Sequence, residues 1–339
     1  MERVQREAYA RAGLLGNPSD IYGGRVIALA LANFRASVAI EPAAAFEIVP
    51  GADDRLVQPS LREAAAALDA FGCDDGVRLV RAALRKAVEL RGGIADLADG
   101  DPRLRFRISY ATSIPRQVGF SGSSAIVTAA LRALAAWLGF PLAAGALADA
   151  ALACETDELG ITAGPMDRVI QAHEGVLFMD FAKPRAPGSL RRIDAARLPP
   201  LFVAWDPSAG APSRKVHGDV RARWLTGDTD LRRVIEELAA LADDGLACLE
   251  ASDGAGLRMA IERSFHVRAR AFPLSERDRA LVEIARKSGA AAKLCGSGGA
   301  VIGALADDAA WPPLERALGD AGYRADLARV AAPTDPNAP

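Results

Sequence analysis

A turn rich in glycine and serine is the part of this chain best suited to chemistry. It spans Ile114 to Ala125, reads IPRQVGFSGSSA, and leads directly into the apolar, alanine-rich run Ile126 to Leu138. Backbone N–H groups in such a turn can close on an anion, and the start of the following helix adds partial positive charge. We therefore expect phosphate binding there, although a turn that merely caps a helix has the same composition.

The expected secondary structure places this turn between a strand and a helix. Arg103 to Tyr110 alternates arginine with apolar residues, as a half-buried strand does, and Ser123 to Leu138 has the pattern of a helix. Nearer the N-terminus, Ala8 to Leu15 and Val26 to Ile40 carry the small and branched residues that suit paired strands. The segment Gly16 to Gly24 is then a loop between these two strands.

The rest of the chain alternates helix and strand patterns, which predicts an α+β protein. Helices are expected over Ala64–Ala70, Val77–Leu90, Leu142–Glu155, Gly164–Ala172, Leu231–Leu249, Gly256–Phe272 and Glu276–Lys287, and strands over Val176–Phe181, Leu201–Trp205, Ala290–Leu294 and Ala300–Ala304. Gly296 to Gly299 forms a loop between the last two strands. The proline-rich and basic stretch Ala182 to Pro200 predicts a junction between domains near residue 190.

Size and charge narrow the class of protein. With 339 residues, half of them apolar, the chain is long enough for two domains, expected at 1–190 and 191–332, followed by a flexible tail at 333–339. The formal net charge of -2 and the dispersed basic residues argue against a nucleic-acid-binding protein, so the expected partner is a small molecule. The sequence makes no prediction of the oligomeric state.

The N-terminus and the apolar segments give no reason to expect a membrane partner. The first residues, MERVQREAYAR, alternate charges, and the apolar region Ala129 to Cys154 is interrupted by Arg132, Pro141 and Asp149. The four cysteines show neither paired spacing nor a metal-binding cluster with the histidines. We therefore expect a soluble protein with reduced thiols in the cytoplasm.

Two further segments accompany the glycine and serine turn: ARAGLLGNPSDIYGGR from Ala10 to Arg25, and AKLCGSGGAVIGAL from Ala292 to Leu305. In this order the three segments resemble the signature motifs of the GHMP kinases, which act on galactose, homoserine, mevalonate and phosphomevalonate. The resemblance covers nearly the whole chain. It implies an N-terminal domain like ribosomal protein S5 domain 2, a ferredoxin-like C-terminal domain, and a site between them. No Walker A sequence is present.

Within that superfamily the chain most resembles the glucuronokinases. The strings that carry this likeness are GNPSDIYGGR (16–25), IPRQVGFSGSSAIV (114–127), ELGITAGPMDRV (158–169) and KVHGDVRARWLTGD (215–228). The resemblance implies transfer of the γ-phosphate of ATP to the 1-hydroxyl of D-glucuronate, with Mg²⁺, giving D-glucuronate 1-phosphate and ADP. The alternatives are a galacturonate, arabinose or galactose 1-kinase, or a sugar- and ATP-binding sensor without activity.

The same resemblance assigns the catalytic residues. Asp167 matches the aspartate beside the acceptor hydroxyl, where a carboxylate can accept the proton or hold it in line for attack. Arg11 matches the arginine of the first motif, which lies near that aspartate and the transferring phosphate. Glu155, twelve positions before Asp167, has the spacing of the magnesium-binding glutamate in galactokinases.

Magnesium would take a second protein oxygen from Ser123, with phosphate and water completing its coordination shell. Ser121 and Ser124 are rivals for this role, because Gly122 stands where many family members have serine. The backbone from Gly119 to Ser124 should surround the β- and γ-phosphates. The expected nucleotide-binding residues are Pro115, Gly119, Phe120, Ser121, Gly122, Ser123 and Ser124.

For the sugar, Asp20 matches the aspartate of the first motif that binds hydroxyl groups in galactokinase. A uronate adds a carboxylate that needs a cationic partner, for which Arg116 and Arg25 are the first candidates, with Lys215 and His217 weaker ones. Absent side chains in the second glycine loop permit close approach to nucleotide or substrate. The expected substrate-binding residues are Asp20, Tyr22, Arg25, Arg116, Gly296, Ser297 and Gly298.

Overall fold

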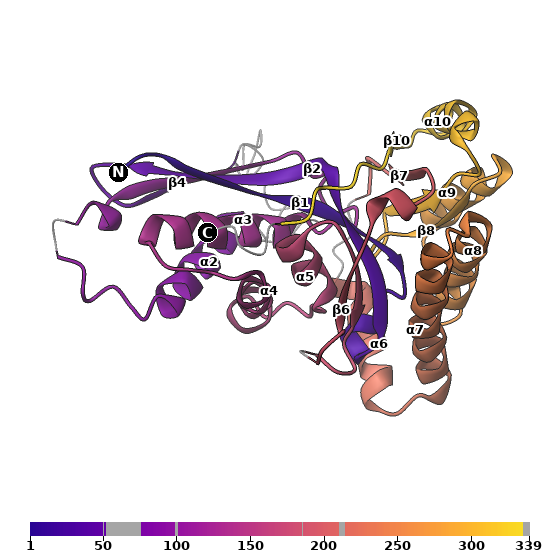
Figure 1. The fold of residues 1–339 in the computed structure, drawn as a ribbon, viewed down its shortest axis with the longest axis horizontal. Coiled ribbons are helices and arrows are strands. Elements are labelled where there is room, and N and C mark those ends of the chain that lie inside the picture. Colours follow the sequence, from indigo (N-terminus) through magenta and orange to yellow (C-terminus); the bar gives the residue numbers. More distant parts are fainter. Residues whose placement is uncertain (50, 52–75, 99–100, 185, 210–213, 335–339) are drawn as a thin grey trace, which may run out of the picture.

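In the part of the chain that the structure describes, the strands form two separate sheets, one of six strands and one of four (Figure 1). The structure, a computed structural model, describes residues 1–49, 51, 76–98, 101–184, 186–209 and 214–334, with the backbone alone for 214–219. The helix expected over Ala64–Ala70 lies outside the described residues. In the described part of the chain, no helix is both long and apolar enough to cross a membrane.

The six-stranded sheet is built around one long strand, β2, which pairs antiparallel with β1, β4 and β5. Its strands are β1 (Val4–Leu15), β2 (Arg25–Pro42), β3 (Glu47–Val49), β4 (Phe106–Thr112), β5 (Val176–Asp180) and β6 (Leu190–Ile193). The two predicted N-terminal strands and the strand before the phosphate-type turn are confirmed. Two short strands, β3 and β6, were not expected; β6 reads LRRI, and its exposed arginines give it no apolar face.

Four helices cover one face of this sheet (Figure 1): α2 (Gly76–Leu90), α3 (Gly122–Leu138), α4 (Ala144–Ala153) and α5 (Met166–His173). Helix α3 is buried along nearly its whole length, because its many alanines let it lie close against β1 and β2. Gly139, with φ of 75°, ends it in the left-handed conformation that favours glycine. Beyond α4 the helix expected to reach Glu155 changes into a π-helical turn, Cys154–Glu158.

The four-stranded sheet has the strand order β10-β7-β9-β8, and all its pairs are antiparallel. Its strands are β7 (Leu201–Trp205), β8 (Ala291–Leu294), β9 (Ala300–Ala304) and β10 (Arg324–Leu327), and the helices of this part are α6 (Arg214–Leu225), α7 (Thr229–Glu250), α8 (Gly254–Ala269), α9 (Glu276–Lys287) and α10 (Trp311–Asp320). The three predicted helices α7, α8 and α9 are confirmed. Helix α10 was missed, because its two prolines occupy the first turn, where they are tolerated.

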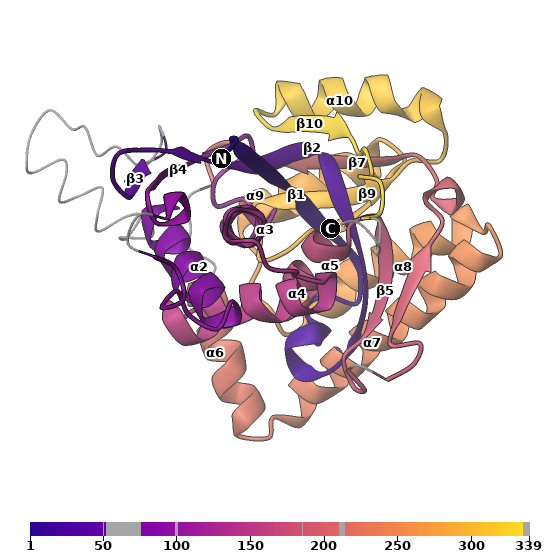
Figure 2. The ribbon, with the colours of Figure 1, turned by 60° about the vertical axis from the view of Figure 1, so that its left-hand side comes forward.

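We call β1–β6 with α2–α5 the N-terminal unit, and β7–β10 with α6–α10 the C-terminal unit. The chain passes from one sheet to the other between Ile193 and Leu201, so the junction predicted near residue 190 falls at the start of β6, which pairs with β5. Helix α7 of the second unit packs against β2 and β1 of the first (Figure 2). The two units therefore share an extensive contact.

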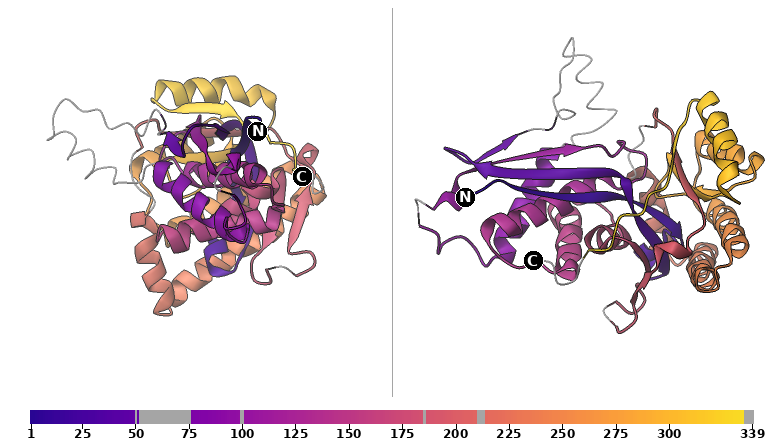
Figure 3. Two further views of the ribbon diagram at one scale, coloured as in Figure 1. Left: turned by 90° about the vertical axis from the view of Figure 1, so that its left-hand side faces the viewer. Right: turned by 45° about the horizontal axis from the view of Figure 1, so that its top comes forward.

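The end of the chain returns to the first sheet (Figure 3). Val330 forms a bridge with Leu31, and the Ala331 N–H donates to the Ala30 carbonyl at 2.9 Å. Of the predicted tail, Pro333 and Thr334 are described, and the Thr334 N–H donates to the carbonyl of His173. Residues 335–339 lie outside the described part.

Candidate active site

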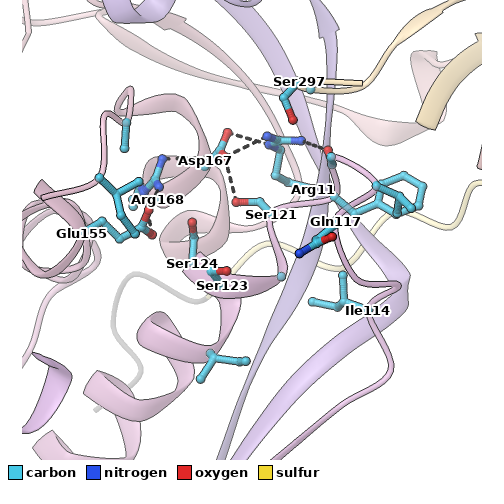
Figure 4. Close-up of a pocket in the computed structure, with 18 of the residues that line it drawn as sticks. Arg11, Ile114, Gln117, Ser121, Ser123, Ser124, Glu155, Asp167, Arg168 and Ser297 are labelled. Atoms are coloured by element: carbon cyan, nitrogen blue, oxygen red, sulfur yellow. Dashed lines mark hydrogen bonds and ion pairs between the residues drawn. The ribbon is translucent and has the colours of Figure 1, made fainter. Parts of the chain in front are cut away.

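The three motif segments meet in one cavity of 390 Å³. Residues far apart along the chain line it, with Arg11 and Asp20 from the first motif, the turn from Ile114 to Ser124, and Gly296 and Ser297 from the second glycine loop. Figure 4 shows Arg11, Ser121 and Asp167 turned toward one another, with Ser297 nearby. The cavity lies where the N-terminal unit meets the glycine loop of the C-terminal unit.

Arg11 and Asp167 form a two-pronged ion pair in this cavity (Figure 4). The Arg11 Nε donates to Asp167 Oδ1 at 2.6 Å, and Nη2 donates to Oδ2 at 2.8 Å. Both side chains are largely buried, with 7% and 16% of their surfaces exposed. The pair joins the middle of β1 to the first turn of α5, so the fold brings together two residues that lie 156 positions apart.

The charge of Asp167 is fixed by these neighbours. Burial acts to raise the pKa of the Asp167 carboxyl, but the charges of Arg11 and Arg168, and hydrogen bonds from Arg11 and Ser121, hold the pKa at about 2. The Ser121 hydroxyl donates to Asp167 Oδ2 at 2.8 Å. Asp167 is thus a carboxylate at neutral pH, with both oxygens oriented by hydrogen bonds.

Arg11 also links the two glycine-containing loops. Its Nη1 donates to the carbonyl of Gly119 and, at 3.5 Å, to that of Cys295. The loops themselves touch, because a Cβ added to Gly119 would lie 2.7 Å from the Gly298 carbonyl oxygen, and one added to Gly296 would lie 2.6 Å from the Gly119 carbonyl oxygen. Only glycine permits this approach of backbone to backbone.

The start of α3 faces the cavity with the geometry of an anion site. Ser121 has a left-handed backbone, with φ of 62°, and no side chain caps the helix that begins at Gly122. The first N–H groups of α3 therefore have no intrahelical partner and are available to phosphate oxygens. Gly122, Ser123 and Ser124 all line the cavity. Of the three serines considered for the metal, Ser121 is engaged with Asp167.

Glu155, expected to bind magnesium, has an arginine partner that we did not foresee. Arg168 donates through Nε to Glu155 Oε1 at 3.1 Å and through Nη2 to Oε2. Its Nη1 donates to the Gly164 carbonyl and lies 3.7 Å from Asp167 Oδ2. Arg168 directly follows Asp167 in the string GPMDRV, and that position is the only sequence signal for its role.

The donor set fits magnesium all the same. No cluster of three or more His, Cys, Asp or Glu residues suited to a metal occurs in the described part of the chain, but magnesium needs only one or two protein carboxylates beside phosphate oxygens and water. Each oxygen of Glu155 keeps a second lone pair beyond the one used by Arg168. Ser123 and Glu155 line the same cavity.

Asp20 is a further carboxylate facing the cavity, and it lies in a short 3₁₀ helix from Ser19 to Tyr22. Burial, and then the charge of Asp167, raise the pKa of Asp20 to about 6, although the Met166 N–H and the nearby arginines act to lower it. A Cβ on Gly164 would lie 2.2 Å from Asp20 Oδ2, so this glycine is what admits the carboxylate. Asp20 and Asp167 thus differ widely in proton affinity.

Three of the expected substrate-binding residues do not line the cavity, namely Tyr22, Arg25 and Gly298. The ring of Tyr22 packs on Trp224 of α6 with 4.5 Å between centroids. Arg25 forms an ion pair with Asp243 of α7 at 2.8 Å, so its guanidinium is directed away from the cavity. Arg116 does line the cavity, but it is exposed at the turn.

Of the other predicted site residues, some line the cavity and some do not. Pro115, Phe120, Gly296 and Ser297 are cavity residues, whereas Gly298 is not among them. The side chains of Lys215 and His217 lie outside the described part of the structure.

Two parts of the chain match models of a known protein family. Residues 78–175 match the GHMP kinases N terminal domain, and residues 246–324 match the GHMP kinases C terminal domain. Glucuronokinase 1 of Arabidopsis thaliana is 38% identical over 309 residues, which cover 88% of this chain and 84% of that protein. The chain belongs to the GHMP kinase family. A second Arabidopsis protein, probable glucuronokinase 2, is 38% identical over 310 residues, covering 88% of this chain and 83% of its own.

Solved structures agree on the fold of this GHMP kinase. The Methanococcus jannaschii mevalonate kinase matches with a TM-score of 0.75 at 17% identity, over 98% of this chain and 99% of its own. The Lactococcus lactis galactokinase complexed with galactose matches with a TM-score of 0.77 at 14% identity, over 98% and 95%. The predicted two-domain GHMP kinase fold is thereby confirmed, and membership makes the chain an ATP-dependent small-molecule kinase.

Proposed function

We propose that this GHMP kinase transfers the γ-phosphate of ATP to the 1-hydroxyl of D-glucuronate, giving D-glucuronate 1-phosphate and ADP. The observation that carries the proposal is the Arg11–Asp167 ion pair, which lies in one cavity with the turn Gly119 to Ser124. The choice of sugar is supported by the two glucuronokinases to which most of the chain is similar.

Asp167 orients the attacking hydroxyl in this proposal. Phosphoryl transfer passes through a loose transition state, so catalysis depends mainly on positioning and on charge stabilisation. A carboxylate with a pKa of about 2 holds a proton weakly, but it accepts a hydrogen bond from the hydroxyl and keeps that oxygen in line with the phosphorus. Arg11 supplies positive charge beside the phosphate and fixes the direction of Asp167.

The triphosphate is held by the backbone from Gly119 to Ser124 and by the free N–H groups of α3. Glu155 and Ser123 would hold magnesium, which when bound neutralises charge on the β- and γ-phosphates. Asp20 would accept hydrogen bonds from sugar hydroxyls. The order along the cavity is then phosphate at the start of α3, reaction at Asp167, and sugar at Asp20.

An ADP-release assay over a panel of acceptors tests the proposal. We expect turnover with D-glucuronate that clearly exceeds turnover with D-galacturonate, D-galactose, L-arabinose and mevalonate. Turnover of galactose or mevalonate with none on glucuronate would overturn the choice of substrate. Tight binding of sugar and ATP without ADP release would instead indicate a sensor.

The pKa of Asp20 predicts a pH dependence of sugar use. The ionised carboxylate accepts hydroxyl hydrogen bonds and the protonated one accepts fewer, so kcat/KM for the sugar should fall by about tenfold per pH unit below about pH 6. Asp20→Asn should lower kcat/KM and remove its fall below pH 6. Asp243→Asn, which alters an exposed ion pair, should leave that pH dependence unchanged. If kcat/KM of Asp20→Asn still falls below pH 6 as in wild type, the titrating group is not Asp20.

A further inference from the structure

Arg168 of α5 is a buried arginine that lines the cavity and has no part in the proposed reaction. Its side chain is 6% exposed, and that of its partner Glu155 is 3% exposed. The Arg168 Nε donates to Glu155 Oε1 at 3.1 Å, Nη2 donates to Oε2, and Nη1 donates to the Gly164 carbonyl at 2.8 Å. Both carboxylate oxygens of Glu155 are therefore already bound to a cation.

Arg168 lies between Glu155 and Asp167, the carboxylates that would hold the metal and orient the acceptor hydroxyl (Figure 4). Its Nη1 is 3.7 Å from Asp167 Oδ2, which is too far for a hydrogen bond but close enough for strong attraction. Asp167 has its own two-pronged partner in Arg11. The four side chains thus form two adjacent ion pairs whose charges cancel.

This balance of charge matters for a divalent cation. In the described part of the chain, three carboxylates line the cavity, those of Asp20, Glu155 and Asp167, and the buried cations that line it are Arg11 and Arg168. Without Arg168 a single buried arginine would face three carboxylates. Because magnesium and manganese bind to carboxylate oxygens, such an excess of negative charge would attract them.

Two effects of Arg168 on a metal at Glu155 oppose each other, and their sizes decide the outcome. The ion pair fixes the Glu155 side chain, which spares the metal the entropic cost of ordering that side chain. A guanidinium and a divalent cation on the same carboxylate also repel each other. In a site shielded from water, repulsion between a single and a double charge is much larger than the ordering of one side chain. The net effect of Arg168 is to weaken metal binding.

We propose that Arg168 keeps Glu155 from binding a divalent cation until a nucleotide is present. The oxygens of a triphosphate add negative charge and further ligands near Ser123 and the start of α3, and these offset the repulsion. Metal and nucleotide then enter the site together. The inference rests on the metal position at Glu155 in the proposed function, and it does not depend on the choice of sugar.

Binding of Mn²⁺ to the nucleotide-free protein tests the proposal, with the electron paramagnetic resonance signal of the free ion as the measurement. Arg168→Gln should bind Mn²⁺ at least about tenfold more tightly than wild type, because glutamine keeps hydrogen-bond donors but has no charge. Arg168→Lys keeps the charge and should stay within about threefold of wild type. Adding Glu155→Gln to Arg168→Gln should abolish the gain.

Wild type should respond to nucleotide in the same titration. With a non-hydrolysable ATP analogue present, it should bind Mn²⁺ at least about tenfold more tightly than without the analogue. The Mn²⁺ bound by the analogue alone is measured separately and subtracted.

Arg132 provides a matched control. It forms an ion pair with Glu174 at 2.8 Å, with side-chain exposures of 16% and 12%, and neither residue is among those that line the cavity. Arg132→Gln and Arg168→Gln should both lower the melting temperature, because each leaves a buried carboxylate without its partner. Millimolar Mn²⁺ without nucleotide should restore part of the loss in Arg168→Gln and none of it in Arg132→Gln.

Four results would overturn the inference. Mn²⁺ binding to nucleotide-free wild type that is as tight as with the analogue would show that Arg168 holds nothing back. Unchanged Mn²⁺ binding in Arg168→Gln, with a lower melting temperature, would make the residue structural. Weaker Mn²⁺ binding in that variant would make Arg168 a support that orients Glu155 for the metal. A gain that survives Glu155→Gln would place the ion elsewhere.

Failure of the proposed function would be seen separately. If the choice of substrate is wrong, wild type will show no ADP release with D-glucuronate, whereas the Mn²⁺ titrations require no sugar and no turnover.

Discussion

Asp167→Asn should lower kcat by about 1000-fold while leaving KM for ATP and for the sugar within a few-fold. Asparagine has nearly the same shape, so the packing at the start of α5 is kept. What is lost is the negative charge, which faces Arg11 and Ser121 and would hold the attacking hydroxyl in line. Steady-state ADP release at saturating ATP and glucuronate measures the effect.

Asp243→Asn is the matched control for that variant. Asp243 also forms an ion pair with an arginine, but the pair is exposed on α7 and outside the cavity, with side-chain exposures of 33% for Arg25 and 47% for Asp243. An exposed pair contributes little, so kcat should equal that of wild type. Full activity in Asp167→Asn would contradict the assigned orienting role.

Arg11→Met should reduce kcat by about 1000-fold or more, and it should also destabilise the protein by about 3 to 5 kcal/mol. The loss of activity follows from removing positive charge beside the phosphate. The loss of stability follows because Asp167 would remain buried without its main counter-ion. Chemical denaturation and ADP release, measured on the same preparation, separate the two effects.

The double variant Arg11→Met with Asp167→Asn separates structure from catalysis further. With both charges gone, no unpaired ion is left behind, so much of the lost stability should return. Activity should not return. Arg11→Lys keeps the charge without the two-pronged geometry and should lie between wild type and Arg11→Met in kcat. A double variant as unstable as the sum of the single ones would show that the pair is not coupled.

The sequence predicted the parts of the site that depend on motif order. Arg11 and Asp167 are 156 positions apart, yet their meeting follows from a family resemblance that fixes the fold. The loop at Gly296 was expected to come close to nucleotide or substrate; in the structure Gly296 lies against the Gly119 carbonyl, a contact between the two loops that the sequence did not predict. The main strands and helices followed from apolar periodicity, because their buried faces repeat along the chain.

The features of the site that the sequence did not predict depend on partners far away along the chain, which residue spacing does not indicate. The sequence predicts no role for Arg168, because no pattern in the residues around it indicates that its side chain pairs with Glu155. Arg25 lies inside a motif, but its side chain forms an ion pair with Asp243 of α7. No local sequence pattern marks Asp243 as the partner of Arg25. Arg268 lies on a helix predicted correctly, but its burial against the Phe272 ring is visible only in the structure.

The returning C-terminal segment has a consequence for biosynthesis. Ala32 donates its N–H to the Arg329 carbonyl, and Ala30 accepts from Ala331, so the central strand of the first sheet obtains part of its hydrogen bonding from residues translated almost three hundred positions later. A ribosome that has delivered only β1 to β6 has therefore produced an unfinished sheet. The sheet of the N-terminal unit can therefore gain these hydrogen bonds only after residues 329–331 have been synthesised.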